Sequence, residues 1–334
     1  MRMGERTGGP AVSVIVTVYN RTEFLKGALE SVHSQEFRDL EVIVADDSSS
    51  EGVRRIVEDL GRPNTHHRPN NRRLGVALSV ASALRAARGR YVAILNDDDA
   101  WEPDFLRELV PPLEKDPRRV AAFSDLWTID EDGMIDAVES EAISRRFRRA
   151  NRPRGDIGDP GTAAVLDKAI PAAAATVFRR DAIDPAMIAT EVGGAYDYWI
   201  ACALASTGRP LFYVPRRLTR YRVHGDMETL SRRADRRDDE LFIVRRVVEA
   251  GWFPHLRRRL KRRLSDVCIF AGANKLLRFG QNREARAVFL EGLRAYPNIF
   301  CLAGYVASFA PRPLVRALLP LAERTAAFRA IVSP

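Results

Sequence analysis

The chain has 334 residues, of which 46% are hydrophobic, so it has room for one large globular domain with an appendage. Its formal net charge of +9 predicts anionic partners. Three dispersed cysteines exclude a zinc pattern and predict reduced, buried residues of a cytoplasmic protein: Cys202, Cys268 and Cys301. Residues 1–10 contain no apolar segment of signal-peptide length, so we expect a disordered leader on a protein that is not exported.

The next hundred residues alternate between apolar, β-branched runs and segments whose apolar residues recur at helical spacing. Strands are predicted at 12–20, 41–45 and 91–95, and helices at 24–32, 53–60, 75–88 and 103–113. This alternation predicts an α/β fold with a doubly wound, mainly parallel sheet. Ligands of such sheets bind beyond the carboxyl ends of the strands.

Each of the three predicted strands ends in polar residues: Thr17, Tyr19 and Asn20, then Asp46 and Asp47, then Asn96, Asp97, Asp98 and Asp99. Consecutive carboxylates repel one another unless a cation lies among them, and Mg²⁺ or Mn²⁺ prefers carboxylate oxygens while keeping positions open for phosphate. We therefore predict a metal and phosphate site that includes Asp98. Capping of the following helix by Asp99 is an alternative that is compatible with this site.

The following segment is predicted to be mixed in structure. We expect a strand at 120–124, a hairpin with an Asp-Gly turn at 127–135, a strand at 174–178, a helix from 196 to about 207, and a strand at 211–214. Residues 144–160 are rich in Arg, Pro and Gly, and they predict a mobile loop such as a lid or a segment that faces an acceptor. From about Asp235 the pattern is helical throughout.

These features resemble the family-two glycosyltransferases, inverting enzymes of the GT-A fold that use nucleotide-diphosphate sugars. The resemblance is carried by residues 12–20, 44–49, 95–101, 194–199 and 220–224. It covers about residues 10–230 and implies a Rossmann-like GT-A domain at 11–230. The helical pattern and basic clusters beyond it predict a separate basic helical C-terminal region at 231–334. The resemblance also implies transfer of a sugar, with inversion, to a hydroxyl group of a glycan or lipid-linked acceptor in cell-envelope polysaccharide biosynthesis, and no nucleic-acid partner.

The resemblance also assigns roles to individual residues. Those placed against the nucleotide sugar are Thr17, Tyr19, Asn20, Asp47, Arg73, Asn96 and Asp97. Asp47 would accept a hydrogen bond from the base, which the N3–H group of uracil can donate, so a UDP-linked donor is expected. Two adjacent acids and a serine, Asp46 to Ser48, also suit a turn that caps a helix, and this alternative stays open.

The chemistry would rest on three further side chains. Asp98 would hold a Mn²⁺ or Mg²⁺ ion that bridges the two phosphates, and His224 would complete the metal or phosphate site. Asp197 would act as the general base that takes the proton of the attacking hydroxyl. The alternatives are that Asp197 is the N-cap of the following helix and that His224 is a polar residue with an ordinary hydrogen-bond partner.

Two departures from the family pattern concern the donor side. Asn96 stands where the family usually has the first acid of its Asp-x-Asp signature, which predicts weaker metal dependence. Val80 and Ala81 occupy positions that are commonly Arg and Asn, so Arg72, Arg73 or a Lys or Arg residue elsewhere in the chain is expected to replace the missing phosphate contact.

Two other functions compete with sugar transfer. A nucleotidyltransferase also combines nucleotide, metal and acidic strand ends, but it normally has a Gly-rich phosphate loop, and residues 17–21 contain no glycine. A protein that binds sugar nucleotides, or serves as a scaffold, without turnover is motivated by the two departures. Retention of both Asp98 and Asp197 counts against it.

The tail from about Asp235 is expected to bring the catalytic domain to an anionic membrane surface, on the inner face of the membrane. Its arginine clusters would attract acidic lipid headgroups, whereas the apolar run at 299–310 is well short of the ~20 residues that span a bilayer. Residues 312–320 mix arginine and leucine as interfacial helices do, and 280–297 resemble one helical-hairpin repeat of the tetratricopeptide type. Packing on the catalytic domain, or homo-oligomerisation through these helices, is the alternative.

Overall fold

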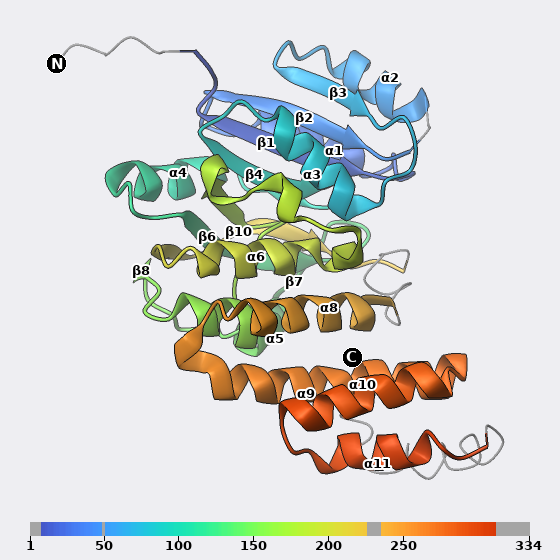
Figure 1. Ribbon diagram of the computed structural model, residues 1–334. Helices are drawn as coiled ribbons and strands as arrows, with labels where there is room; N and C mark the ends of the chain where they lie inside the picture. Colours follow the sequence, from blue (N-terminus) through green and yellow to red (C-terminus); the bar gives the residue numbers. More distant parts are fainter. Residues whose placement is uncertain (1–7, 49–50, 226–234, 312–334) are drawn as a thin grey trace. The chain divides into compact units, whose positions relative to one another are not determined.

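A computed structural model describes residues 8–48, 51–225 and 235–311 of the chain (Figure 1). The chain divides into two compact units, Met1–Met227 and Glu228–Pro334. This division lies close to the boundary between 230 and 231 that we predict from the sequence. Residues 1–7, most of the expected leader, lie outside the described residues.

The N-terminal unit begins with a four-stranded parallel layer. Its strands are β1 (Val12–Val18), β2 (Leu40–Asp46), β3 (Thr65–Pro69) and β4 (Tyr91–Asn96), in the order β3-β2-β1-β4. The connecting helices are α1 (Leu25–His33), α2 (Glu51–Leu60) and α3 (Val76–Ala86). The predicted alternation is therefore confirmed. The edge strand β3 was not predicted, because its polar sequence Thr-His-His-Arg-Pro carries no strand pattern.

The sheet continues beyond β4 in the order β9-β6-β10-β5, so ten strands belong to it. These strands are β9 (Thr176–Arg179), β6 (Ala121–Ile129), β10 (Leu211–Arg222) and β5 (Ala100–Trp101), and short strands β7 (Ile135–Asp136) and β8 (Gly155–Asp156) pair with β6 and β10. The β6 and β10 strands are parallel, whereas β9 is antiparallel to both of its neighbours. The sheet is thus mostly parallel, as predicted, with antiparallel strands in its second half.

Helices cover both faces of this sheet. Alternate residues of β1, such as Val14 and Val16, join one large core with side chains of α1, α2 and α4 (Phe105–Lys115). Ile15 points away from that core, on the face where α3 contacts β1 and β2. The remaining helices of the unit are α5 (Ala137–Arg146) and α6 (Tyr196–Ser206). The structure therefore has the layers expected of a doubly wound sheet (Figure 1).

Residues 127–135 form the predicted hairpin, because β6 pairs with β7 and Gly133 has the positive φ of 85° that the Asp-Gly turn requires. The prediction of an irregular loop at 144–160 is wrong in part. The start of this segment completes α5, β8 adds two residues to the sheet, and Arg149 is only 3% exposed. A buried ion pair between Arg149 and Asp125 holds the segment against β6.

The C-terminal unit is helical, as predicted. Its helices are α8 (Asp235–Ala250), α9 (Arg257–Asn274), α10 (Asn282–Ala295) and α11 (Ile299–Ala307), with short turns η5 (Pro254–Leu256) and η6 (Lys275–Phe279). Residues 280–297 contribute a single helix rather than a hairpin, and α10 packs against both α9 and α11. A Cβ atom at Gly292 would lie 2.6 Å from the sulfur of Cys301, so this glycine permits close packing of α10 on α11.

The three cysteines are buried and form no disulfide, as predicted for them. Within the described residues, no helix is both long enough and apolar enough to cross a membrane. The mixed arginine and leucine segment at 312–320 lies outside the described residues.

Candidate active site

Three consecutive acids form the turn between β4 and β5. Asp97, Asp98 and Asp99 are 1%, 8% and 2% exposed, so this turn buries three carboxyl groups side by side. Arg21, from the loop after β1, places Nη2 2.7 Å from Asp97 Oδ1 and Nη1 2.9 Å from Asp98 Oδ2. His224 Nε2 lies 3.2 Å from the same Asp98 oxygen. Cationic and N–H donor groups therefore gather on the acid that we predict to hold a metal.

Burial keeps this turn from being fully ionised. Loss of hydration raises the pKa of the Asp97 carboxyl to about 7, against the opposing charge of Arg21 and with help from the charge of Asp98. Burial, followed by the Asp98 charge, raises the pKa of Asp99 well above its ordinary value. Near neutral pH Asp97 and Asp99 thus retain protons that would be lost in water.

Asn96 connects this turn to β1 and to α6. Its Oδ1 atom accepts hydrogen bonds from Thr17 Oγ1 at 3.1 Å and from the Tyr196 hydroxyl at 2.7 Å, and its Nδ2 donates to Asp99 Oδ2 at 3.2 Å. An acid at this position would offer no donor to Asp99. The departure from the family signature is therefore matched by a contact that needs an amide.

At the end of β2, both acids are occupied by neighbouring groups of the chain. Asp47 accepts hydrogen bonds from the backbone N–H groups of Leu74 (2.7 Å) and Gly75 (2.8 Å), at the start of α3, and is 6% exposed. Asp46 accepts from the Ser48 backbone and hydroxyl. The Asp46 contacts are those of a local turn, whereas the Asp47 contacts join the end of β2 to the segment before α3. A contact of Asp47 with a nucleotide base would need the remaining lone pairs of its carboxylate.

The loop after β1 forms the rim of the site. Tyr19 is 38% exposed, and the guanidinium of Arg73 lies 4.3 Å from the centre of its ring, so these two predicted residues lie together. Asn20 between Tyr19 and Arg21 has a positive φ of 56°, which turns the chain toward the acids. Further along, Phe24 packs against the ring of His224 at 5.3 Å.

Asp197 lies in the first turn of α6 and is half-buried. It is not the N-cap, since that position is Ala195, so the capping alternative is wrong. Among the described residues, none donates a hydrogen bond to its carboxylate or forms an ion pair with it. The adjacent Tyr196 joins it to Asn96 and hence to the acidic turn.

The donor set around Asp98 fits a divalent metal only in part. Within the described residues, no group of three or more His, Cys, Asp or Glu side chains is arranged to hold a metal ion alone. Mg²⁺ and Mn²⁺ sites in phosphate-handling proteins often use one or two protein ligands together with substrate phosphates and waters. Asp98 and His224, whose side chains meet at 3.2 Å, are suitable for a site of this kind.

Three residues at this site were missed by sequence reasoning: Arg21, Tyr196 and Arg222. The backbone N–H of Arg222 donates to Asp99 Oδ1, and its Nε donates to the carbonyl oxygen of Asp98. The signal for Arg21 and Tyr196 was available, because each adjoins a residue that we had selected. That Arg222 returns to the same turn follows only from the pairing of β10 with β5.

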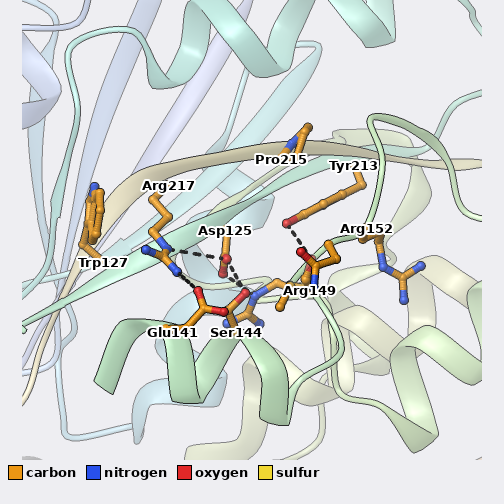
Figure 2. A pocket seen from close by; sticks show the side chains of 11 residues that line it. Asp125, Trp127, Glu141, Ser144, Arg149, Arg152, Tyr213, Pro215 and Arg217 are labelled. Atoms are coloured by element: carbon orange, nitrogen blue, oxygen red, sulfur yellow. Dashed lines mark hydrogen bonds and ion pairs between the residues drawn. The ribbon is translucent and has the colours of Figure 1, made fainter. Parts of the chain in front are cut away.

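A polar pocket lies elsewhere in this unit, with a volume of about 320 Å³, between α5, β6 and β10. Figure 2 shows that its charged side chains pair with one another: Arg149 Nε bonds Asp125 Oδ1 at 2.7 Å, and Arg217 Nη2 bonds Glu141 Oε2 at 2.7 Å. The Ser144 hydroxyl donates to Asp125 Oδ2. This cluster ties α5 and the following segment to the sheet, and it contains none of the residues predicted for the active site.

Comparison with known proteins agrees with this geometry. Residues 13–170 match the family model described as glycosyl transferase family 2. The succinoglycan biosynthesis protein ExoO of Rhizobium meliloti is 29% identical over 144 residues, which cover 43% of this chain and 41% of ExoO. A Campylobacter jejuni GalNAc(5)-diNAcBac-PP-undecaprenol beta-1,3-glucosyltransferase is 36% identical over 93 residues, 27% of this chain and 30% of that protein. The chain thus matches less than half the length of these curated relatives.

Solved structures resemble a larger part of the chain. TarS from S. aureus, in complex with UDP-GlcNAc, superimposes with a TM-score of 0.65 at 13% identity, over 93% of this chain and 91% of that chain. The mannosyltransferase PcManGT from Pyrobaculum calidifontis, in complex with GDP-Man and Mn²⁺, gives 0.56 at 20% identity, over 97% and 83%. At these identities the likeness shows the fold, which is GT-A. Residues 13–170 are thus similar to glycosyl transferase family 2, and the fold of the chain is that of GT-A proteins.

Proposed function

We propose that this protein transfers a sugar from a nucleoside diphosphate sugar to a hydroxyl group of its acceptor, with inversion at the anomeric carbon. The observation that carries the proposal is the pairing of two groups at one sheet edge. A carboxylate without a partner among the described residues, Asp197, is linked through Tyr196 and Asn96 to the buried acidic turn. One group suits proton abstraction and the other suits diphosphate binding.

The transfer would be a single displacement. Asp197 takes the proton of the acceptor hydroxyl while the oxygen of that hydroxyl bonds to the anomeric carbon. The bond from this carbon to the diphosphate oxygen breaks, and the nucleoside diphosphate leaves with the electron pair. Asp197 lies in the first turn of α6, at the end of the helix where the dipole interacts favourably with negative charge.

Asp98 and His224 would hold a divalent ion, Mn²⁺ or Mg²⁺, together with the phosphates of the donor. Such an ion, when bound, neutralises the charge that develops on the leaving diphosphate. The presence of Mn²⁺ in PcManGT supports a divalent ion here, without deciding which one. Asp97 and Asp99 would support Asp98 from within the turn.

The donor is proposed to be UDP-linked, with Tyr19 and Arg73 at the rim against the base or ribose. The exposed Tyr19 ring, with the Arg73 guanidinium above it, offers a flat surface of the kind on which a nucleotide base stacks. TarS binds UDP-GlcNAc, whereas PcManGT binds GDP-Man, so the solved structures allow both nucleotides. The UDP assignment therefore rests on Asp47 and its remaining lone pairs.

The acceptor is proposed to be a glycan or lipid-linked saccharide of the cell envelope. The names of ExoO and of the undecaprenol-dependent glucosyltransferase support this class. The helix α11 supports a membrane-associated acceptor, because Ile299, Leu302 and Val306 recur on one of its faces and are 69%, 46% and 62% exposed. Exposed arginines of α9, which contacts α11, would attract acidic lipid headgroups.

The test is a screen of UDP- and GDP-linked sugars with Mn²⁺, read as thermal stabilisation and then as release of nucleoside diphosphate. Wild-type protein is expected to bind a donor and turn it over. Asp197→Asn is expected to bind the donor with unchanged affinity but to lose turnover, since an amide cannot take the proton. Asp98→Ala is expected to lose metal-dependent donor binding.

The outcomes separate the rival functions. Formation of nucleoside triphosphate and sugar 1-phosphate from the nucleotide sugar and added pyrophosphate, instead of release of nucleoside diphosphate, would identify a nucleotidyltransferase. Donor binding without turnover in the wild type, across a panel of acceptors, would identify a binding or scaffold protein. Turnover of Asp197→Asn within a few-fold of wild type would assign the base to another residue.

A further inference from the structure

Arg21 makes the most direct contact with the acids of the proposed metal site. Its guanidinium bridges Asp97 and Asp98, with N···O distances of 2.7 and 2.9 Å, and its side chain is 24% exposed. Both carboxylates are nearly buried, so this cation compensates charges that water cannot reach. Arg21 is thus a partner of the metal-binding turn itself.

The contact competes with a metal for one atom. Arg21 Nη1 and His224 Nε2 both approach Asp98 Oδ2, at 2.9 and 3.2 Å. A divalent ion coordinates a carboxylate oxygen at about 2.1 Å and repels a guanidinium held against the same oxygen. Binding of the ion to Asp98 therefore requires the Arg21 guanidinium to move away.

The donor side lacks a charged residue where one is expected. Val80 and Ala81, which replace the Arg and Asn of the family pattern, are fully buried in α3 and cannot contact a phosphate. The guanidinium of Arg222 is held by the carbonyl oxygens of Asp98, Asp130 and Glu131. That of Arg73 lies over the Tyr19 ring. Arg21 is partly exposed, borders the acids and lies on a loop.

We propose that Arg21 is an exchangeable cation of the active site, which holds Asp97 and Asp98 when no donor is bound and turns to the donor diphosphate when a divalent ion takes Asp98. This inference rests on the proposed function and names a donor-binding residue for it. A diphosphate offers the guanidinium two oxygens in the geometry that arginine prefers. Arg21 thereby exchanges one pair of anionic partners for another.

The exchange makes metal and nucleotide binding cooperative. A metal ion alone must break the Arg21 ion pairs without replacing them, so it binds weakly. A metal ion together with a diphosphate supplies a new partner for Arg21, so each ligand raises the affinity of the other. Removal of Arg21 should therefore raise the affinity for the metal ion alone and reduce the gain in that affinity when a nucleotide is added.

The experiment is calorimetric titration of Mn²⁺ into the full chain, alone and with saturating UDP or GDP, for wild type, Arg21→Ala and Arg21→Lys. Arg21→Ala is expected to bind Mn²⁺ alone about 10- to 100-fold more tightly, the range of charge-assisted hydrogen bonds. The gain in Mn²⁺ affinity on adding nucleotide should shrink by a similar factor. Arg21→Lys, which keeps a charge without the fork, should lie between them.

The matched control is Arg54→Ala, which removes an arginine paired with Glu51 and Glu58 on the exposed face of α2 and should change neither affinity. Unchanged or weaker Mn²⁺ binding by Arg21→Ala, including no detectable binding by either protein, overturns the exchange and leaves Arg21 as a purely structural ion pair. Undiminished cooperativity overturns the phosphate contact. If neither UDP nor GDP affects wild type, the proposed donor class fails, while the titration with Mn²⁺ alone still decides the competition at Asp98.

Discussion

Replacement of Asn96 by Asp restores the acid of the family signature, and the structure predicts that it makes the protein unstable at high pH. The Asn96 amide donates to Asp99 Oδ2 at 3.2 Å, and Asp99 is 2% exposed. In Asn96→Asp, two carboxyl groups meet at this distance. Two full charges there would repel by about 5 kcal/mol at an effective dielectric constant of about 20.

Retention of a proton is the less costly state. One additional proton held by the folded protein lowers the free energy of unfolding by about 1.4 kcal/mol for each unit of pH above the unfolded pKa. Burial already raises the pKa of Asp99 in the wild type, so the variant differs from it only where wild-type Asp99 has ionised and the pair has not. Over at most three units of pH, from 5 to 8, this amounts to up to about 4 kcal/mol, which is less than the repulsion. The pKa of the pair is thus higher in the folded protein than in the unfolded chain. A carboxyl group with this difference lowers the free energy of unfolding as pH rises, so the variant loses stability at high pH.

The assay is thermal unfolding of wild type and Asn96→Asp at pH 5, 6.5 and 8. The gap between their midpoints should widen by up to ~10 °C from pH 5 to pH 8, the shift that about 4 kcal/mol produces in a domain of this size. Asn96→Ala, which loses the same hydrogen bonds without adding an acid, should show a smaller change of the gap with pH, because loss of the Asn96 hydrogen bond raises the Asp99 pKa without bringing a second carboxyl group. A constant gap for Asn96→Asp would refute the reasoning, because it would mean that the two carboxyl groups do not interact.

Three further predictions follow from the same geometry. Burial raises the pKa of Asp97 to about 7, above its value in the unfolded chain. The wild type should therefore lose stability as pH rises from 4 to 7, by up to about 1.4 kcal/mol for each unit of pH. Asp97→Asn should flatten this part of the thermal-stability profile. Arg149→Met removes the closest ion-pair partner of the buried Asp125 and leaves it Arg217 at 3.8 Å. This should lower the free energy of unfolding by about 3 kcal/mol, measured by denaturant titration. No change would show that the cluster does not hold residues 144–160. Full-length protein should co-sediment with anionic vesicles but not with neutral ones, and high salt should weaken this binding. The double variant Leu302→Ser, Val306→Ser should no longer bind the vesicles. Wild-type protein that stays in the supernatant at low salt would favour packing or oligomerisation of α11.

The sequence by itself determined the parallel half of the sheet and the edge at which the site lies. Strands β1, β2 and β4 are buried on both faces, so each reads as an apolar run that stops at polar residues. Because parallel strands end at the same edge, Thr17 and Asn96 could be placed together, and they are register partners in the structure. Local chemistry and strand direction were sufficient for this.

Only the tertiary structure decided the partners of the charged side chains. Arg21 pairs with Asp97 across 76 positions of the chain, and Arg149 with Asp125 across 24, and neither spacing belongs to a helix or a hairpin. The edge strand β3 and the two-residue strand β5 are likewise defined by backbone hydrogen bonds to neighbours, which leave no periodic pattern of side chains. An apolar run reports its burial locally, whereas an ion pair depends on where the fold brings its second member.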